Sequence, residues 1–241
     1  MIGKTVFYII MLVGHVLTAT AQHDNARKND FVDGTFAFAS YQGTLSILYV
    51  HNWRIGSSKR LGFGLGARFT SYLGANQYYI TAPAELTSES TSPLIFFKEN
   101  IEANIDSLLI ESPQTNSINA SINIDYRISP KLTVGFNIDA IGFSFGATKK
   151  GNYINGTQGK ITEASPTAFN VLLISDNDRG SLNSELYFKY LYTNKWAIKT
   201  AAQFLFTEYT TETKVQQFPS PNDRFRNKSL LLAVGISYQL N

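Results

Sequence analysis

The sequence predicts an all-β fold of about eight antiparallel strands, and three features of the chain support this prediction. Beyond about residue 33 the apolar residues recur with a period of two, and no 3.6-residue period is sustained. Most of the strand candidates are about ten residues or longer, against the five or six that are typical of globular proteins. Short and long connections alternate between these candidates.

The predicted strands place apolar and polar side chains on opposite faces. In the segment SINASINIDYRIS, Ile118 and Ile122 lie on one side of a strand, and Asn119 and Asn123 lie on the other. The apolar set of the fifth strand changes phase near Ala140–Ile141, so we expect a β-bulge there. The eight candidates are roughly residues 33–41, 44–55, 60–73, 117–128, 131–146, 181–193, 195–209 and 228–240.

The connections between these strands are of two kinds. Tight turns at 56–59, 129–130 and 193–194 are built from Gly, Ser, Pro, Thr and Asn. Long structureless loops are uncommon in a compact soluble domain, whereas a membrane barrel has short turns at one end and longer loops at the other. We therefore predict a transmembrane antiparallel up-and-down β-barrel with short periplasmic turns and long extracellular loops. The long segments are about 74–116, 147–180 and 210–227.

The N-terminal residues 1–21 are predicted to be a cleaved signal peptide. Lys4 gives a positive start, an apolar run follows, and Ala19-Thr20-Ala21 matches a cleavage site. The alternative is a membrane-anchoring helix, but the run is about a dozen residues long and a bilayer requires about 20. We expect residues 22–32 to form a flexible mature N-terminus and residues 33–241 to form the barrel.

The composition excludes several classes of function. Charged residues are 16% of the chain and the formal net charge is +3. No Lys/Arg cluster is long enough to follow a nucleic-acid backbone. The chain has no cysteine, which excludes a disulfide framework and thiolate metal sites. No nucleic-acid partner and no cofactor are predicted.

Alternation alone does not decide whether the apolar faces meet a protein core or lipid. The polar faces carry Gly, Ser, Asn and Thr rather than the Lys and Glu of a solvated sheet, which favours lipid. Aromatic residues also concentrate near the strand ends, as in the girdles of membrane barrels. Toward the short turns these are Tyr49, Trp53, Tyr126, Tyr190, Tyr192, Trp196 and Tyr238, and toward the other end Phe69, Phe143, Phe145, Phe204 and Phe206.

With these features the chain resembles the small, eight-stranded outer-membrane β-barrel proteins of Gram-negative bacteria. The resemblance covers roughly residues 33–241 and includes the final strand LLLAVGISYQLN, although the family favours a terminal Phe and this chain ends in Leu240-Asn241. It implies location in the cell outer membrane, contact with lipid and lipopolysaccharide, and assembly by the barrel-assembly machinery through the C-terminal strand. The family includes membrane-stabilising proteins, adhesins and a few lipid-modifying enzymes.

The interior of such a barrel is expected to be filled by side chains. Eight strands leave just enough room for them, and buried charges must be paired. We therefore expect a polar network that plugs the lumen. The alternative is a narrow ion or small-solute channel that favours anions, because cations outnumber carboxylates among the inward-facing charged residues. These are Arg54, Arg68, Asp125, Arg127, Asp139, Glu185, Lys189 and Lys199.

No sequence motif points to catalysis, and the protein is predicted not to be an enzyme. The alternative, a lipid-acting site, would use His51 on the lipid-facing side, together with a serine and an acid. A G-x-S-x-G elbow is absent. The segment Asp176-Asn177-Asp178-Arg179-Gly180 begins like a calcium loop but lacks the later carboxylate, so no metal site is predicted.

The long loops are the predicted functional surface. The segments Leu94-Ile95-Phe96-Phe97, Leu108-Leu109-Ile110 and 169–174 are too apolar for disordered external tails. We expect them either to extend or cap the barrel wall, or to dock a partner protein at the cell surface. Arg224 and Arg226 are interpreted as part of a polar turn region without specific chemistry.

Overall fold

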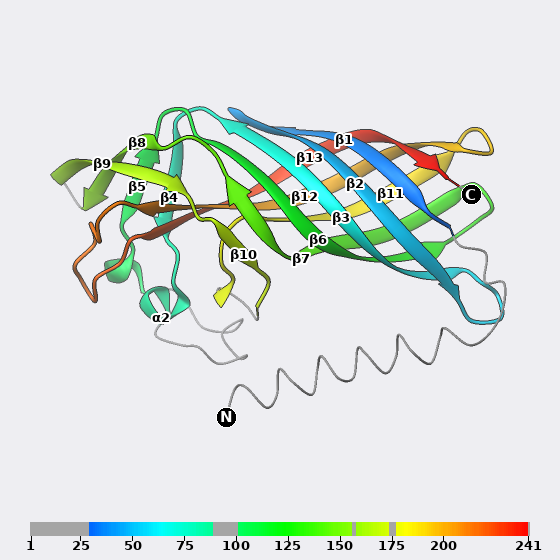
Figure 1. Ribbon diagram of the computed structural model, residues 1–241, viewed down its shortest axis with the longest axis horizontal. Coiled ribbons are helices and arrows are strands. Elements are labelled where there is room, and N and C mark those ends of the chain that lie inside the picture. Colours follow the sequence, from blue (N-terminus) through cyan, green and yellow to red (C-terminus); the bar gives the residue numbers. More distant parts are fainter. Residues whose placement is uncertain (1–28, 89–100, 156–157, 174–176, 241) are drawn as a thin grey trace, which may run out of the picture.

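The computed structural model describes residues 29–88, 101–155, 158–173 and 177–240. These residues form thirteen strands, joined in one sheet, and two short helices (Figure 1). Of the helices in this described part, neither is long and apolar enough to cross a membrane. The strands are β1 (Phe31–Ala39), β2 (Gln42–Ile55), β3 (Leu61–Gly74), β4 (Gln77–Thr81), β5 (Ser107–Ile110), β6 (Gln114–Arg127), β7 (Leu132–Phe145), β8 (Lys149–Asn155), β9 (Gln158–Pro166), β10 (Phe169–Val171), β11 (Leu182–Leu191), β12 (Trp196–Thr211) and β13 (Arg224–Gln239), and the helices are α2 (Ala84–Thr87) and η2 (Glu102–Asn104).

Eight of the thirteen described strands pair into a closed antiparallel ring, which we call the main ring. Its order is β1-β2-β3-β6-β7-β11-β12-β13, and β13 closes it by pairing with β1. Each strand matches one of the eight predicted segments, with ends shifted by a few residues. The first, β1, begins at Phe31 rather than at residue 33. The predicted signal peptide lies outside the described residues.

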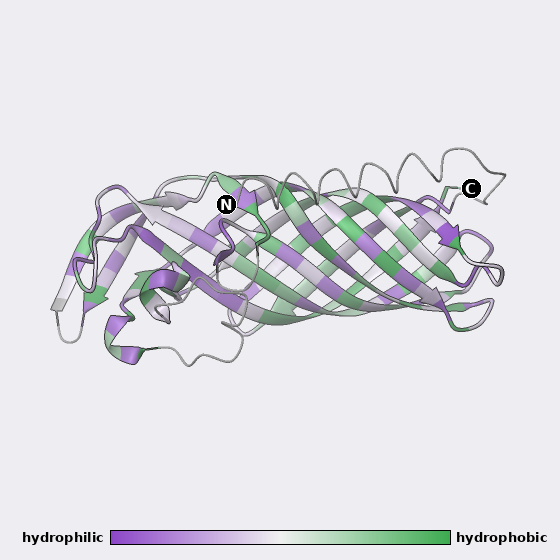
Figure 2. Cartoon of the chain, turned by 90° about the horizontal axis from the view of Figure 1, so that it is seen from below, coloured by the Kyte–Doolittle hydropathy of each residue, from purple (hydrophilic) through white to green (hydrophobic). Residues whose placement is uncertain are grey.

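The main ring is apolar outside and mostly polar inside, where a smaller apolar cluster gathers around Tyr72 and Leu231. On β6, Ile118 and Ile124 are 54% and 49% exposed, whereas Asn119 and Asn123, on the other face, are 1% and 0% exposed. Figure 2 shows the same alternation of apolar and polar residues along the strands of the ring. The apolar faces therefore do not form the core of the main ring.

The predicted β-bulge is present between β6 and β7. Ala120 lies opposite Ile141, and the next residue, Ser121, lies opposite Asp139, so that Ala140 faces no residue of β6. The extra residue shifts the alternation by one position, so that the apolar residues beyond it again point outward. Phe143, for example, is 64% exposed.

The long segments are not structureless, and the predicted strand count of about eight is too low. The segment 74–116 contains β4 and β5, and the segment 147–180 contains β8, β9 and β10. Four of these strands and the ends of β12 and β13 close a second ring in the order β12-β9-β8-β5-β4-β13. We call it the outer ring (Figure 1, left). β12 and β13 are 16 residues long and belong to both rings.

The outer ring has an apolar core. The Tyr79 and Tyr209 rings are 5.1 Å apart, and those of Tyr153 and Phe225 are 6.0 Å apart. This is the ordinary arrangement of a sheet that meets water on one face. The buried cluster consists of Tyr79, Leu108, Ile110, Tyr153, Ala164, Tyr209, Val215 and Phe225. The apolar segment Leu94-Ile95-Phe96-Phe97 lies outside the described residues.

Candidate functional site: the charged interior of the main ring

Charged side chains from β1, β11 and β12 meet inside the main ring. Asp33 lies between two lysines: its Oδ1 is 2.8 Å from Nζ of Lys189, and its Oδ2 is 3.0 Å from Nζ of Lys199. Nζ of Lys199 is also 2.6 Å from Oε2 of Glu185. All four residues are at most 8% exposed. The pairing of opposite charges offsets the loss of hydration that such burial causes.

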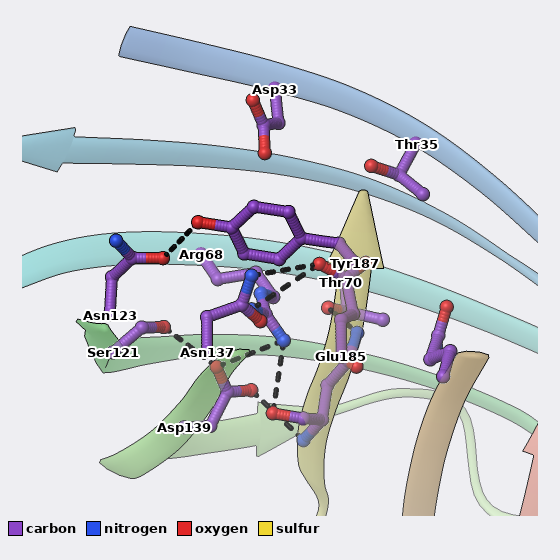
Figure 3. A network of polar contacts seen from close by, with 12 residues as sticks. Asp33, Thr35, Arg68, Thr70, Ser121, Asn123, Asn137, Asp139, Glu185 and Tyr187 are labelled. Carbon is purple, nitrogen blue, oxygen red and sulfur yellow. Dashed lines mark hydrogen bonds and ion pairs between the residues drawn. The ribbon is translucent and has the colours of Figure 1, made fainter. Parts of the chain in front are cut away.

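The chain of ion pairs continues to β3 and β7. Nη2 of Arg68 is 3.8 Å from Oε2 of Glu185, and its Nη1 is 3.4 Å from Oδ1 of Asp139. Arg68 also donates to the backbone carbonyl of Asn183 and to the side-chain oxygen of Asn137. Figure 3 shows Arg68, Asp139 and Glu185 pointing toward one another from β3, β7 and β11. The network therefore spans the interior from wall to wall.

A second cluster lies closer to the short turns. Asp125 accepts hydrogen bonds from the guanidinium of Arg54 and from Nδ2 of Asn52, the latter at 2.6 Å. The hydroxyl of Tyr187 donates to Oδ1 of Asn123 at 2.9 Å. Gly135 makes room for this hydroxyl, because a Cβ at that position would collide with it.

The buried charges of the main ring balance. Its described part contains four cations, Arg54, Arg68, Lys189 and Lys199, which pair with four carboxylates, Asp33, Asp125, Asp139 and Glu185. The predicted excess of two cations, which motivated an anion-preferring channel, falls to one when Asp33 is counted, and the remaining cation is Arg127 at the mouth of the ring. The phase that places Thr35 and Ala37 inward also places Asp33 inward and could have identified it.

Arg127 is the predicted member that lies outside these two clusters. It is at the end of β6 and lines the mouth of the ring near the short turns. Its side chain is half-buried rather than enclosed. The other seven predicted charged residues lie in the two clusters described above.

The predicted aromatic residues lie on the outer surface of the main ring. Near the short turns, Tyr190 and Tyr192 are 51% and 52% exposed, and the rings of Trp196 and Tyr238 are 4.7 Å apart. The remaining members there are Tyr49 and Tyr126, 40% and 44% exposed, and Trp53, which stacks on Phe63. At the opposite end, Phe69, Phe143, Phe145 and Phe204 are exposed, and Phe206 is half-buried.

His51 has an acidic partner on the outer surface. Its Nδ1 is 2.8 Å from Oδ1 of Asp30, and the hydroxyl of Tyr49 donates to Oδ2 of Asp30 at 3.3 Å. The residue opposite His51 on β3 is Leu65. Within the described residues no hydrogen bond joins His51 to a serine.

Asp178 and Gly180, from the segment that begins like a calcium-binding loop, form part of a turn. Oδ1 of Asp178 accepts a hydrogen bond from the backbone N–H of Leu173 at 2.6 Å, and Gly180 has a positive φ of 76°. Asp176 lies outside the described residues. In the part of the chain that is described, no group of three or more His, Asp or Glu residues could hold a metal ion.

Sequence reasoning missed a third charged cluster, where the two rings meet. Glu208 is 0% exposed and accepts hydrogen bonds from Nε of Arg224 at 2.8 Å and from Nη2 of Arg226 at 2.7 Å. Both arginines also donate to the backbone carbonyl of Asp178. The two arginines are therefore not a polar turn without specific chemistry: they tie the segment that precedes β11 to β12 and β13.

No protein-family model and no curated protein sequence matches this chain. Similar solved structures include the attachment invasion locus protein Ail of Yersinia pestis, with 8% identity, a TM-score of 0.37, and coverage of 88% of this chain and 98% of Ail. Neisserial surface protein A (NspA) has 11% identity, a TM-score of 0.34, and coverage of 88% and 95%. A major outer membrane protein from Thermus thermophilus has 11% identity, a TM-score of 0.34, and coverage of 88% and 99%.

Proposed function

We propose that this chain is an outer-membrane β-barrel protein whose main ring spans the bilayer. The observation that carries the proposal is the apolar outer face of a ring whose interior is charged. Removing one Leu, Ile or Phe side chain from water is worth about 1.5–3 kcal/mol, and soluble monomers rarely expose apolar patches larger than a few hundred Å². Hydrocarbon tails would take up this face without exposing it to water.

Strand length and backbone pairing support this proposal. A transmembrane strand requires about 9–11 residues, and β2, β3, β6 and β7 have 14 each. In hydrocarbon every backbone group must be paired, which a closed ring achieves. With the short turns in the periplasm, the outer ring stands outside the cell. The C-terminal strand β13 is then the segment offered to the barrel-assembly machinery.

The proposed role is structural or interactive and not enzymatic. The wall-to-wall ion pairs favour a lumen closed by side chains, because its four buried cations are matched by four carboxylates. The alternative is a narrow ion or small-solute channel. Planar-bilayer recordings of the folded protein should show closed traces, and discrete conductance steps would support the channel instead.

The outer ring is the surface on which we place recognition of a partner protein or of lipopolysaccharide. Its core is packed, so its outward side chains are held on a fixed frame. Among these, Tyr78 on β4 and Ile161 on β9 are 56% and 75% exposed. A pull-down from native membranes with the complete chain should recover a partner that is not recovered with a variant lacking residues 149–163.

The location can be tested on intact cells. Trypsin added outside should cleave at Lys150 or Lys160, which are exposed on the outer ring, and should leave the main ring intact. Lys131 in a periplasmic turn should become accessible after the outer membrane is opened. A processed chain that stays monomeric and folded in buffer without detergent would contradict the proposal.

The non-enzymatic part of the proposal has its own test. Lipid A from cells with and without the protein should have the same mass profile. A mass difference would point to a lipid-modifying activity, and loss of that difference in His51→Ala would identify the site.

A further inference from the structure

A cavity of about 180 Å³ opens at the short-turn mouth of the main ring. Residues from every side of the ring line it, including Asn29 before β1, Thr133 on β7 and Ser237 on β13. A water molecule occupies about 30 Å³ of liquid, so the cavity can hold a small polyatomic ion with part of its hydration shell. The interior network described above forms its floor.

The lining of this cavity is cationic. Arg54, Arg127, Lys131 and Lys189 line it, and Asp125 is the one carboxylate among its described lining residues. Asp125 already accepts hydrogen bonds from Arg54, Asn52 and Asn123. With Asp33, which pairs with Lys189, two carboxylates offset two of the four cations, and the cavity keeps a smaller excess of positive charge.

Arg54 adds a second, independent observation. Its side chain is 5% exposed, and one of its guanidinium nitrogens donates to Asp125. Its Nε is buried and has no hydrogen-bond partner among the described residues. An unsatisfied buried donor at a charged group is costly, and a guanidinium that turned toward the cavity, which Arg54 lines, could offer this donor to an acceptor there.

The rim of the mouth extends the positive field. Lys59 and Arg60 lie in the turn between β2 and β3, and Lys195 lies in the turn between β11 and β12, all of them exposed. With Lys131, each of the three short turns therefore carries a cation. A concave site with charges of one sign on its rim focuses the field and raises the local concentration of ions of the opposite sign.

We propose that this mouth is a binding site for a small oxyanion group, a phosphate or a carboxylate. Arg54 and Arg127 supply planar donor sets that match oxyanion geometry, and Lys131 and Lys189 supply point charges. Neutral donors on Asn29 and Ser237 complete the lining. The site is distinct from the outer-ring surface, and its test does not depend on which side of the membrane it faces.

The test uses the complete mature chain folded in a detergent without phosphate. Inorganic phosphate and acetate are the probes, titrated calorimetrically at constant ionic strength maintained with chloride. We expect saturable one-site binding of at least one probe. The double variant Arg127→Gln/Lys131→Gln should weaken it by about tenfold or more, because two charged contacts are lost.

Two further variants separate the site from general surface charge. Lys149→Gln/Lys150→Gln removes the same charge from the outer ring and should leave binding unchanged. Thr133→Trp fills the cavity without changing the charge and should weaken binding. Each variant must first show the heat-dependent gel shift of the folded protein. Absence of saturable binding, or equal affinity in the Arg127/Lys131 double variant, would overturn the proposal.

The source of the oxyanion can be distinguished with nanodiscs. In phosphatidylglycerol nanodiscs, loss of phosphate binding would show that a lipid headgroup occupies the site. Retained binding would show that the ligand is a free solute. The first outcome assigns the site to lipid and the second to a soluble ligand, and both require the saturable binding described above.

Discussion

On β6 of the main ring, Ile118 and Ile124 point away from the interior, whereas on β5 of the outer ring Leu108 and Ile110 point into it. The two rings are built from the same alternating pattern and are even joined through β12 and β13. They differ in which face of the pattern is buried by protein. The alternating pattern therefore predicts that a strand has one apolar and one polar face. It does not predict which of the two faces points into the ring, because that depends on what surrounds the ring.

Along the single strand β13, the outward-facing residues change from charged to apolar. Near the outer ring its outward residues are Arg224, Arg226 and Lys228, and beyond them they are Leu230, Leu232, Val234 and Ile236. On β12 the change falls between Phe206 and Glu208. Because Phe206 pairs with Lys228 and Glu208 with Arg226, both strands change at one level. Under the proposed function, this level would be the outer boundary of the hydrocarbon layer.

Removing a charge from the core of the main ring should have the largest effect on stability. Asp33→Asn leaves Lys189 and Lys199 without a shared carboxylate, at a cost of about 3–5 kcal/mol. Urea unfolding in detergent micelles measures this loss in the free energy of unfolding. Glu163→Gln, at an exposed carboxylate on the outer ring, is the matched control and should change little. Equal stability of the two variants would show that the main ring does not depend on its ion pairs.

Truncating the apolar core of the outer ring should come next. Leu108→Ala should cost about 2–5 kcal/mol of local stability and should speed tryptic cleavage of the outer ring. The main ring should keep its heat-dependent gel shift. If both rings unfolded together, the shared strands would couple them into a single cooperative unit.

A charge placed on the outward face should distinguish the rings most directly. Leu232→Arg puts a cation on the apolar belt and should cost up to about 2–4 kcal/mol, depending on its depth in the bilayer. Ile161→Arg, on the outer ring, should stay within about 0.5 kcal/mol. Yield of folded protein in lipid vesicles measures both. Equal tolerance would remove the distinction between a lipid-facing and a water-facing ring.

The smallest expected effect is a pH dependence of the stability of the outer ring. Burial and the hydrogen bond to Asp106, 2.6 Å long, raise the pKa of Tyr153 to about 12 from its ordinary value of 10.0. Because the folded state disfavours the tyrosinate, this contribution to stability is complete below pH 10 and is lost as the pH rises toward 12. Tryptic cleavage of the outer ring should increase over that range, and the increase should be smaller in Tyr153→Phe.

Long strands were predictable from the sequence because their pattern repeats often enough to be unambiguous. All eight strands of the main ring and the bulge at Ala140 follow from a period of two. Of the outer-ring strands, β4 and β5 were missed because they have five and four residues, too few for a period to be recognised. β8 and β9 have seven and nine residues, but few of these are apolar. The apolar character of β5 was visible in Leu108-Leu109-Ile110, but not the strands with which it pairs.

The charged interior was predictable residue by residue but not in its pairing. The facing of each strand placed Glu185 and Lys199 inward, yet their contact depends on the register between β11 and β12 and on the curvature of the ring. Glu208 and Arg226 share the outward face of their strands and are nevertheless buried, because the segment around Asp178 contacts them. Such a contact between distant segments leaves no periodic signal.

The shared use of β12 and β13 also bears on the order of assembly. The strands β4 and β5 are synthesised well before residue 196, yet their ring closes only when the last two strands of the chain have arrived. The outer ring is therefore absent from any shortened or unfinished polypeptide. A ligand that binds it would select molecules in which both rings are complete.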